Sequence, residues 1–192
     1  MNERSLINNN QLIRSVDDGI AVLRLNRPDQ ANALNSELFN LLTQELDELR
    51  WDADVRAVVI TGEGEKAFCA GIDLRERAKK EKTEILLERE KIIRPFFLAL
   101  GAFPKPTIAA LNGVALGGGA ELAITCDIRV ACPRAKFGQT EIRWGMMPSC
   151  GACQRLRLIV GMGIAKELIL TGRILEAEEA HRLGIYNRLV PG

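Results

Sequence analysis

Three consecutive glycines, Gly117 to Gly119, stand immediately before a helical pattern that contains Glu121. A glycine run that opens a helix leaves backbone N–H groups without helical partners, and these donors favour a negatively charged oxygen. Glycine also lets the backbone approach such an oxygen closely. The sequence therefore predicts an anion-stabilising backbone site here. Glu121 is then either a favourable first-turn helix residue or a catalytic group.

Residues that could hold a metal ion or carry redox chemistry are few. The Cys150–Cys153 pair is formally a C-x-x-C motif, but a zinc site would need about two further ligands. The single histidine, His181, lies in a helical pattern rich in Ala and Glu, so we expect a surface or packing residue. We predict no metal site and reduced, mostly buried thiols. The five cysteines are Cys69, Cys126, Cys132, Cys150 and Cys153.

The composition is that of an ordinary globular protein. The chain has 192 residues, 47% of them apolar and 27% charged, so we expect one domain over residues 1–192. Its 26 basic and 25 acidic residues give a net charge of +1, which offers no general attraction for nucleic acid or an anionic membrane. No apolar run approaches the ~20 residues of a membrane span, and the N-terminus lacks the apolar core of a signal peptide. We expect the cytoplasm, or an organelle matrix if a leader was removed.

Strand and helix patterns alternate along the first part of the chain. Gln11–Val16 and Ile20–Leu25 predict a β-hairpin around an Asp-Gly turn. Ser36–Trp51 predicts an amphipathic helix, capped by Asn35 or by its own Ser36. Val55–Thr61 is almost entirely apolar and predicts a strand buried on both faces. This alternation indicates an α/β fold.

The second part of the chain continues the alternation. Pro95 lies within a helical pattern and should end or kink it, unless it starts a new helix. A charged segment before that pattern predicts a solvated face or a mobile loop. The expected helical segments are Arg75–Lys82, Glu84–Leu100, Arg155–Val160, Gly163–Leu170 and Glu176–Leu183, and the expected strands are Thr107–Leu111, Ile128–Ala131 and Ile185–Val190.

Three motifs, taken in this order, resemble the crotonase superfamily, the enoyl-CoA hydratase/isomerase family. They are AFCAGIDL at Ala67–Leu74, the glycine-rich stretch at Lys105–Ala131, and FGQTEI followed by QRL within Phe137–Leu156. RPDQANAL at Arg27–Leu34 and the C-terminal stretch Gly163–Val190 also fit. The resemblance therefore covers nearly the whole chain from about residue 18. It implies a spiral of repeated ββα units, with two sheets meeting at a steep angle and helices flanking them.

The resemblance also implies a reaction on an acyl-CoA thioester. Its carbonyl oxygen would accept N–H bonds from Ala70 and Gly118, where preorganised donors stabilise an enolate. Glu121 would act as base toward water, and Glu141 would deliver the proton to Cα. Two carboxylates in one small site repel, so one pKa should rise and the pair should titrate as a unit. No metal or redox cofactor is implied, since coenzyme A is part of the substrate.

Further ligand contacts follow from the same resemblance. Ala31 and Ala33 would lie along the pantetheine and adenine, although ordinary core packing is an equal alternative for such apolar residues. Asp73 could cap the following helix as easily as touch the ligand. The expected substrate-binding residues are Ala31, Ala33, Phe68, Ala70, Gly71, Ile72, Asp73, Leu74, Gly117, Gly118, Thr140 and Gly145; candidates for the CoA phosphates are Arg27, Lys66 and Arg75.

The two glutamates together favour an enoyl-CoA hydratase. Two alternatives remain open: an isomerase or other enolate chemistry on the same fold, and a CoA-binding or protein-binding domain without catalysis. Pro148–Cys153 replaces the glycine-rich turn of relatives, and the C-terminal helices that usually cover the acyl site and build a trimer are not seen before Gly192. We therefore expect an open apolar patch, and a homo-oligomer (trimer or dimer of trimers) if those helices are not essential.

One segment also resembles a subgroup with RNA-binding members. FCAGIDLRERAKK is similar to the methylglutaconyl-CoA hydratases, some of which bind RNA. The predicted helix Ser36–Trp51 is acidic rather than rich in lysine. We therefore predict neither nucleic-acid binding nor membrane binding.

Overall fold

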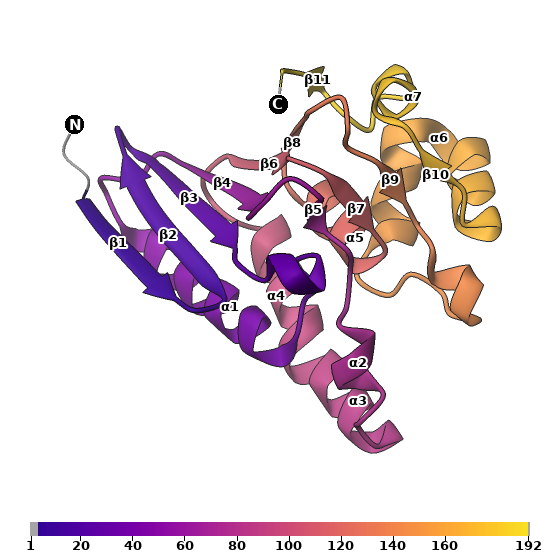
Figure 1. The fold of residues 1–192 in the computed structure, drawn as a ribbon, viewed down its shortest axis with the longest axis horizontal. Helices are drawn as coiled ribbons and strands as arrows, with labels where there is room; N and C mark the ends of the chain where they lie inside the picture. Colours follow the sequence, from indigo (N-terminus) through magenta and orange to yellow (C-terminus); the bar gives the residue numbers. More distant parts are fainter. Residues whose placement is uncertain (1–3, 192) are drawn as a thin grey trace.

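A repeated strand–strand–helix path organises the chain (Figure 1). In the computed structural model, which describes residues 4–191, each repeat places its first strand in a large sheet and its second strand in a small one. A helical segment then carries the chain to the next repeat. The strand pairs are β4 (Ala57–Gly62) with β5 (Ala67–Cys69), β6 (Thr107–Leu111) with β7 (Val114–Leu116), and β8 (Ile128–Ala131) with β9 (Phe137–Gly138).

The two sheets have separate strand orders. The large sheet has seven strands in the order β1-β2-β3-β4-β6-β8-β11, and the small sheet has four in the order β10-β9-β7-β5. β3, β4, β6, β8 and β11 are mutually parallel, as are β5, β7 and β9. The prediction of an α/β spiral with two sheets and flanking helices is confirmed. The remaining strands are β1 (Arg4–Asn9), β2 (Leu12–Asp17), β3 (Ile20–Leu25), β10 (Ile174–Leu175) and β11 (Arg188–Leu189).

The predicted hairpin is formed by β2 and β3. Its turn residues Asp18 and Gly19 have φ values of 43° and 75°, and the turns that suit two-residue hairpins require this left-handed backbone. β3 then pairs with β4 in parallel, which joins the antiparallel edge to the spiral. The antiparallel strand β1 adds a further edge that the sequence did not predict.

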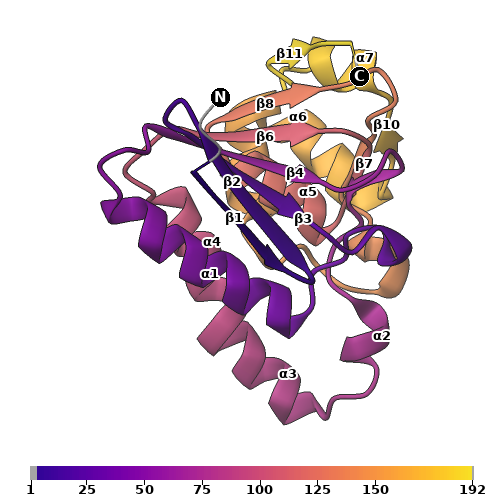
Figure 2. The same ribbon diagram turned by 60° about the vertical axis from the view of Figure 1, so that its left-hand side comes forward.

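Helix α1 (Ser36–Trp51) begins and packs as its sequence predicts. The Asn35 side chain caps it by accepting a 2.9 Å hydrogen bond from the amide of Leu38. Its apolar face is buried and lies beside α4 (Arg94–Gly101), and both views show the two helices side by side (Figures 1 and 2). The rings of Phe39, Phe96 and Phe97 meet edge to face there, with centroids 5.2–6.2 Å apart.

Pro95 neither ends nor sharply breaks the long helical pattern. The path runs from α3 (Lys82–Glu88) through a π-helical segment, Arg89–Ile93, into α4, where Pro95 occupies the first turn. Proline is best tolerated in the first turn of a helix, and here that turn follows the π-helical segment directly. The charged segment predicted as a solvated face contains the short helix α2 (Leu74–Arg77).

Helix α5 (Gly118–Thr125) is buried along its whole length. A Cβ atom at Gly119 would lie 2.0 Å from the carbonyl oxygen of Cys69, so only glycine allows α5 to lie this close to β5. The 20-residue α6 (Ala152–Thr171) is interrupted at Gly161, where φ is 78°, and the two predicted helical segments lie on either side. The remaining elements are α7 (Ala177–Arg182) and the 3₁₀ turns Pro28–Gln30 and Glu141–Trp144.

Three further observations concern His181, membrane spans and metal ligands. His181 is exposed, and its Nδ1 lies 2.8 Å from the carbonyl oxygen of Tyr186, which confirms a surface and packing role. None of the helices within residues 4–191 is long and apolar enough to cross a membrane. Nor does that part of the chain group three His, Cys, Asp or Glu residues that could hold a metal ion.

The contact at Gly119 generates a stability prediction. Gly119→Ala should lower the free energy of unfolding by about 3 kcal/mol or more, because α5 or β5 must move to admit the methyl group. Gly163→Ala is the matched control, since a Cβ there meets nothing within 4 Å, and it should stabilise the helix by about 0.5–1 kcal/mol. Urea unfolding monitored by circular dichroism measures both. Equal stability of the two variants would contradict the close approach.

Candidate active site

Three segments meet where the parallel strands β5, β7 and β9 end. Because parallel strands point the same way, their carboxyl ends lie at one edge of the sheet. The segments that follow them are Ala70–Ile72, Gly117–Gly118 and Gln139–Glu141. Together with the turn before α6 they enclose a cavity of about 380 Å³. The predicted site residues that line it are Ala70, Gly71, Ile72, Leu74, Gly117, Gly118, Glu121, Thr140 and Glu141.

One of the two expected oxyanion donors is already occupied. The amide of Ala70 donates a 3.0 Å hydrogen bond to the carbonyl oxygen of Ala31, so its N–H is not free for a ligand. The prediction that the Ala70 amide is an oxyanion donor is therefore wrong, although Ala70 lines the cavity. Among residues 4–191, the amides of Ile72 and Gly118 have no such acceptor.

The amides of Ile72 and Gly118 lie close together. A Cβ built on Gly118 would sit 3.3 Å from the Ile72 nitrogen, and one built on Gly71 would sit 3.2 Å from the Gly118 nitrogen. Gly71 has a φ of 104°, which strongly favours glycine and allows this approach. Two open N–H donors on neighbouring segments can bind one developing oxyanion.

The Ile72 amide is left open by the strand-like pairing of its neighbours. Leu34 donates a 2.8 Å bond to the carbonyl oxygen of Gly71 and accepts a 2.9 Å bond from the amide of Asp73. In such a parallel bridge the central residue, here Ile72, bonds the partner strand with neither its N–H nor its C=O. The N–H of Ile72 therefore points away from Leu34.

Glu121 is held on α5 with one carboxylate oxygen anchored. Its side chain is 2% exposed, and Oε1 accepts hydrogen bonds from the amides of Cys150 at 2.8 Å and Ala152 at 3.0 Å. Burial raises the pKa of Glu121, while these two amides and the Arg155 charge oppose the rise. Both amides bond Oε1, and the carboxyl lines the cavity.

Glu141 opens a 3₁₀ turn directly after β9. A Cβ at Gly117 would lie 3.5 Å from its Oε1, which places the carboxyl beside the glycine run. With its amide nitrogen facing the carboxyl, the fully buried Gln139 donates to both Glu141 oxygens at 3.1 and 3.2 Å. Burial, and then the nearby Glu121 charge, raise the pKa of Glu141 to about 7.

The two carboxyls have different surroundings. Glu121 has two backbone donors, lies in the first turn of α5 and is attracted by Arg155, and all three favour its anion. The negative charge of Glu121 raises the pKa of Glu141, and no cation is among the causes that act on it. We therefore place the proton on Glu141 and the negative charge on Glu121. One group is then poised as an acid and the other as a base.

Several predicted ligand contacts lie outside the cavity. Phe68 is completely buried in the core, so the packing alternative holds for it. Asp73 caps α2 by accepting from the amides of Arg75 and Glu76, and it forms a 2.8 Å ion pair with Arg27. The other residues outside the lining are Ala31, Ala33 and Gly145; Ala31 and Ala33 support the site through backbone carbonyls that accept from Ala70 and Arg27.

The turn that departs from the family pattern supports the site with its backbone. Pro148–Cys153 supplies the two amides that anchor Glu121, and Gly151 takes a φ of 113° before α6 begins. Burial and the Glu121 charge raise the pKa of the Cys150 thiol, which keeps it protonated. All five cysteines are free thiols, as predicted.

Sequence reasoning missed several residues of the site. Nothing in the letters marks the amide of Ile72 as free and that of Ala70 as bonded. Gln139, next to a candidate acid, could have been singled out as a buried amide beside a carboxyl. Arg77 and Arg89 reach the cavity from the segment that the sequence presented as a solvated face and the helix after it.

The fold and the site together define a class of protein. The family model described as enoyl-CoA hydratase/isomerase matches residues 15–192, and the chain belongs to this family. It is 43% identical over 182 residues to a short-chain-enoyl-CoA hydratase of Clostridium acetobutylicum, covering 94% of this chain and 69% of that protein. It is also 43% identical over 172 residues to the mitochondrial methylglutaconyl-CoA hydratase of Mus musculus, covering 90% of this chain and 54% of that protein.

Solved structures agree with these relatives. An enoyl-CoA hydratase from Bacillus anthracis superposes with a TM-score of 0.92 at 40% identity, covering 94% of this chain and 70% of that chain. The chain spans 65%, 69% and 54% of the length of three curated relatives that it matches.

The raised pKa of Glu141 predicts a pH-dependent stability. The pKa of Glu141 is higher in the folded protein than in the unfolded chain. The folded protein therefore loses stability as the pH rises from the ordinary pKa of 4.5 to the folded value of about 7. Glu141→Gln removes this loss, so the variant should match the wild type near pH 4.5 and be more stable above pH 7. Chemical unfolding at several pH values measures the difference. A difference that stays constant with pH would contradict the assigned proton.

Proposed function

We propose that the protein is an enoyl-CoA hydratase, which adds water across the double bond of a 2-enoyl-CoA to give a 3-hydroxyacyl-CoA. The observation that carries the proposal is the convergence of two open amides and two carboxyls on one cavity. The family includes hydratases and isomerases, and the pairing of a poised acid with a poised base favours hydration.

Each group has a defined role in the proposed reaction. Glu121, anchored through Oε1, takes a proton from water through Oε2 as the water oxygen bonds to Cβ. The electrons of the double bond move onto the thioester oxygen, where the amides of Ile72 and Gly118 donate to the enolate. Glu141 then gives its proton to Cα, so the product gains one hydroxyl and one hydrogen.

The remaining parts of the proposal concern partners. The substrate is an acyl-CoA thioester, and the reaction needs no metal or redox cofactor because the charge is stabilised by amides. The chain spans only part of its relatives, and the activity is proposed for the protein as given. We also expect a homo-oligomer, a trimer or dimer of trimers, without nucleic-acid or membrane partners.

The acid role of Glu141 is tested with crotonyl-CoA. Glu141→Gln should lower kcat by about a hundredfold or more, because the amide cannot deliver a proton. Glu178→Gln, which alters an exposed acid on α7, is the matched control and should keep the wild-type rate. Loss of absorbance of the conjugated thioester reports the rate, and analysis of the product distinguishes a 3-hydroxyacyl-CoA from an isomerised enoyl-CoA. Equal rates for Glu141→Gln and wild type would refute the mechanism.

The oxyanion donor at Gly118 is tested by replacing its N–H with the ring nitrogen of proline, whose Cδ takes the place of the hydrogen. Gly118 is the first residue of α5, a position where proline is tolerated, so Gly118→Pro deletes the N–H with little cost to the helix. We expect kcat to fall by about 10²–10³-fold. Gly118→Ala introduces the same Cβ, 3.2 Å from Ile72 Cγ1, but keeps the N–H and should retain most of the activity. Similar losses in both variants would assign the effect to crowding instead.

A further inference from the structure

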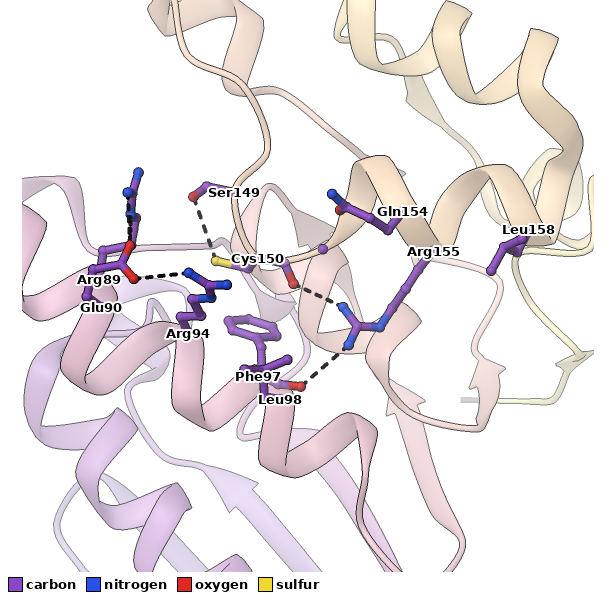
Figure 3. A pocket seen from close by; sticks show the side chains of 11 residues that line it. Arg89, Glu90, Arg94, Phe97, Leu98, Ser149, Cys150, Gln154, Arg155 and Leu158 are labelled. Carbon is purple, nitrogen blue, oxygen red and sulfur yellow. Dashed lines mark hydrogen bonds and ion pairs between the residues drawn. The ribbon is translucent and has the colours of Figure 1, made fainter.

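Arg155 of α6 lies in a cradle formed by two glycines. Its half-buried guanidinium reaches from α6 toward α4 and forms part of the wall of a cavity of about 610 Å³ between these helices (Figure 3). A Cβ built on Gly151 would overlap Nη1, and one built on Gly101 would lie 2.7 Å from Nη2. A side chain at either position would therefore displace the guanidinium.

This guanidinium bonds the turn that holds Glu121. Its Nη1 donates a 3.2 Å hydrogen bond to the carbonyl oxygen of Cys150, and its Nη2 donates a longer 3.5 Å bond to that of Phe97 in α4. The amide of Cys150 donates in turn, at 2.8 Å, to Oε1 of Glu121. One residue of the turn thus links the arginine to the proposed base, and α4 braces the arginine from the other side.

No ion pair neutralises the positive charge of Arg155. Within residues 4–191 no carboxylate lies in salt-bridge contact with it. The acid in the wall of the same cavity, Glu90, already pairs with Arg89 at 3.0 Å and with Arg94 at 3.1 Å. The charge of Arg155 is therefore left to act at longer range, on the carboxyl that the turn holds.

Glu121 receives this charge. Burial raises the pKa of Glu121, and the bonds from Ala152 and Cys150, and then the Arg155 charge, oppose the rise. In the described part of the chain, Arg155 is the cation that contributes to this balance. Its loss would leave a buried carboxylate that hydrogen bonds alone keep ionised. The other titratable or charged groups that face Glu121 or line its cavity are Glu141, Cys150, Cys153, Arg77 and Arg89.

We propose that Arg155 is a positioning residue for the hydration reaction: it braces the turn Pro148–Cys153, whose amides hold Glu121, and its positive charge favours the anionic base. This inference rests on the proposed hydratase function and deepens it, because it assigns the group that keeps the base in place. Arg155 acts through the turn, since it does not line the active-site cavity itself. A guanidinium suits this task because it is always charged and its planar donors can serve two carbonyl oxygens at once.

The pH dependence of crotonyl-CoA hydration tests this role. Arg155→Gln should lower kcat by about tenfold or more, as expected when hydrogen bonds from a charged group are lost, while KM changes little. The acidic limb of the kcat profile reports the protonation of Glu121. This limb should move to higher pH by about 0.5 unit or more, because the anion loses a nearby positive charge. A merely structural role would lower the rate at every pH without moving the limb.

Further variants separate the charge from the hydrogen bonds. Arg155→Lys keeps the charge but loses the planar donors, so its acidic limb should stay near that of the wild type while kcat recovers only in part. Arg155→Ala empties the cradle between Gly101 and Gly151. Added ethylguanidinium should then raise kcat several-fold, whereas ethylurea, a neutral analogue of the same shape, should not.

Arg157→Gln is the matched control. It removes the same charge from the same helix, but Arg157 is exposed and lines neither cavity. This variant should keep the kcat and the acidic limb of the wild type. Urea unfolding of every variant confirms that folded proteins are compared.

A measurement without turnover keeps this inference separate from the hydratase proposal. The Glu121 carboxyl is titrated by NMR in protein that carries isotope-labelled glutamate, and its signal is assigned by its loss in Glu121→Gln. The titration should move to higher pH in Arg155→Gln and stay in place in Arg157→Gln.

The outcomes are distinct. A wild type that does not hydrate crotonyl-CoA overturns the hydratase function, and the Glu121 titration then still decides the inference. Hydration by the wild type, with an unchanged kcat or an unmoved acidic limb in Arg155→Gln, overturns the positioning role and leaves the hydratase function standing. If Arg155→Gln does not fold, a displaced limb in Arg155→Lys overturns the inference, and a limb in place with a reduced kcat supports it.

Discussion

The parallel pairing of β5, β7 and β9 is the constraint on which the site depends. These strands have only two or three residues each, yet their common direction brings three distant segments to one edge of the small sheet. One segment brings the open amide of Ile72, the next brings that of Gly118 and leads to Glu121, and the third brings Glu141. A shift of one strand by a single residue would exchange the faces of its side chains and separate these groups.

Close backbone approach makes this convergence possible. Gly119 lets α5 start directly against β5, and Gly71 lets the chain turn so that the Ile72 and Gly118 amides become neighbours. Glycine loses more conformational entropy on folding than other residues do. The burial of α5 and of the aromatic cluster between α1 and α4 offsets this cost. The stability of the scaffold and the geometry of the site therefore share the same glycines.

Electrostatics then separates two chemically identical side chains. Glu121 is bonded to the start of α6 by two amides, whereas Glu141 is half-buried beside it and accepts hydrogen bonds from the side-chain amide of Gln139. The same turn before α6 anchors Glu121 and lines the active-site cavity. The two anchoring donors are backbone amides, so the path of this turn holds the carboxylate in place.

The sequence alone determined the α/β class, the hairpin, α1, and the central strand with its glycine-opened helix, because periodicity and local motifs record these directly. The pair Glu121 and Glu141 was expected only from the resemblance to the family. It could not decide which amide near Gly71 stays open: Ala70 and Ile72 both belong to one motif, and only the pairing with Leu34 and Ala31, more than thirty residues away, uses one and frees the other. The same holds for the proton on Glu141. Hydrogen-bond partners, desolvation and cavities arise from atoms that meet through the fold, and a local pattern carries no record of them.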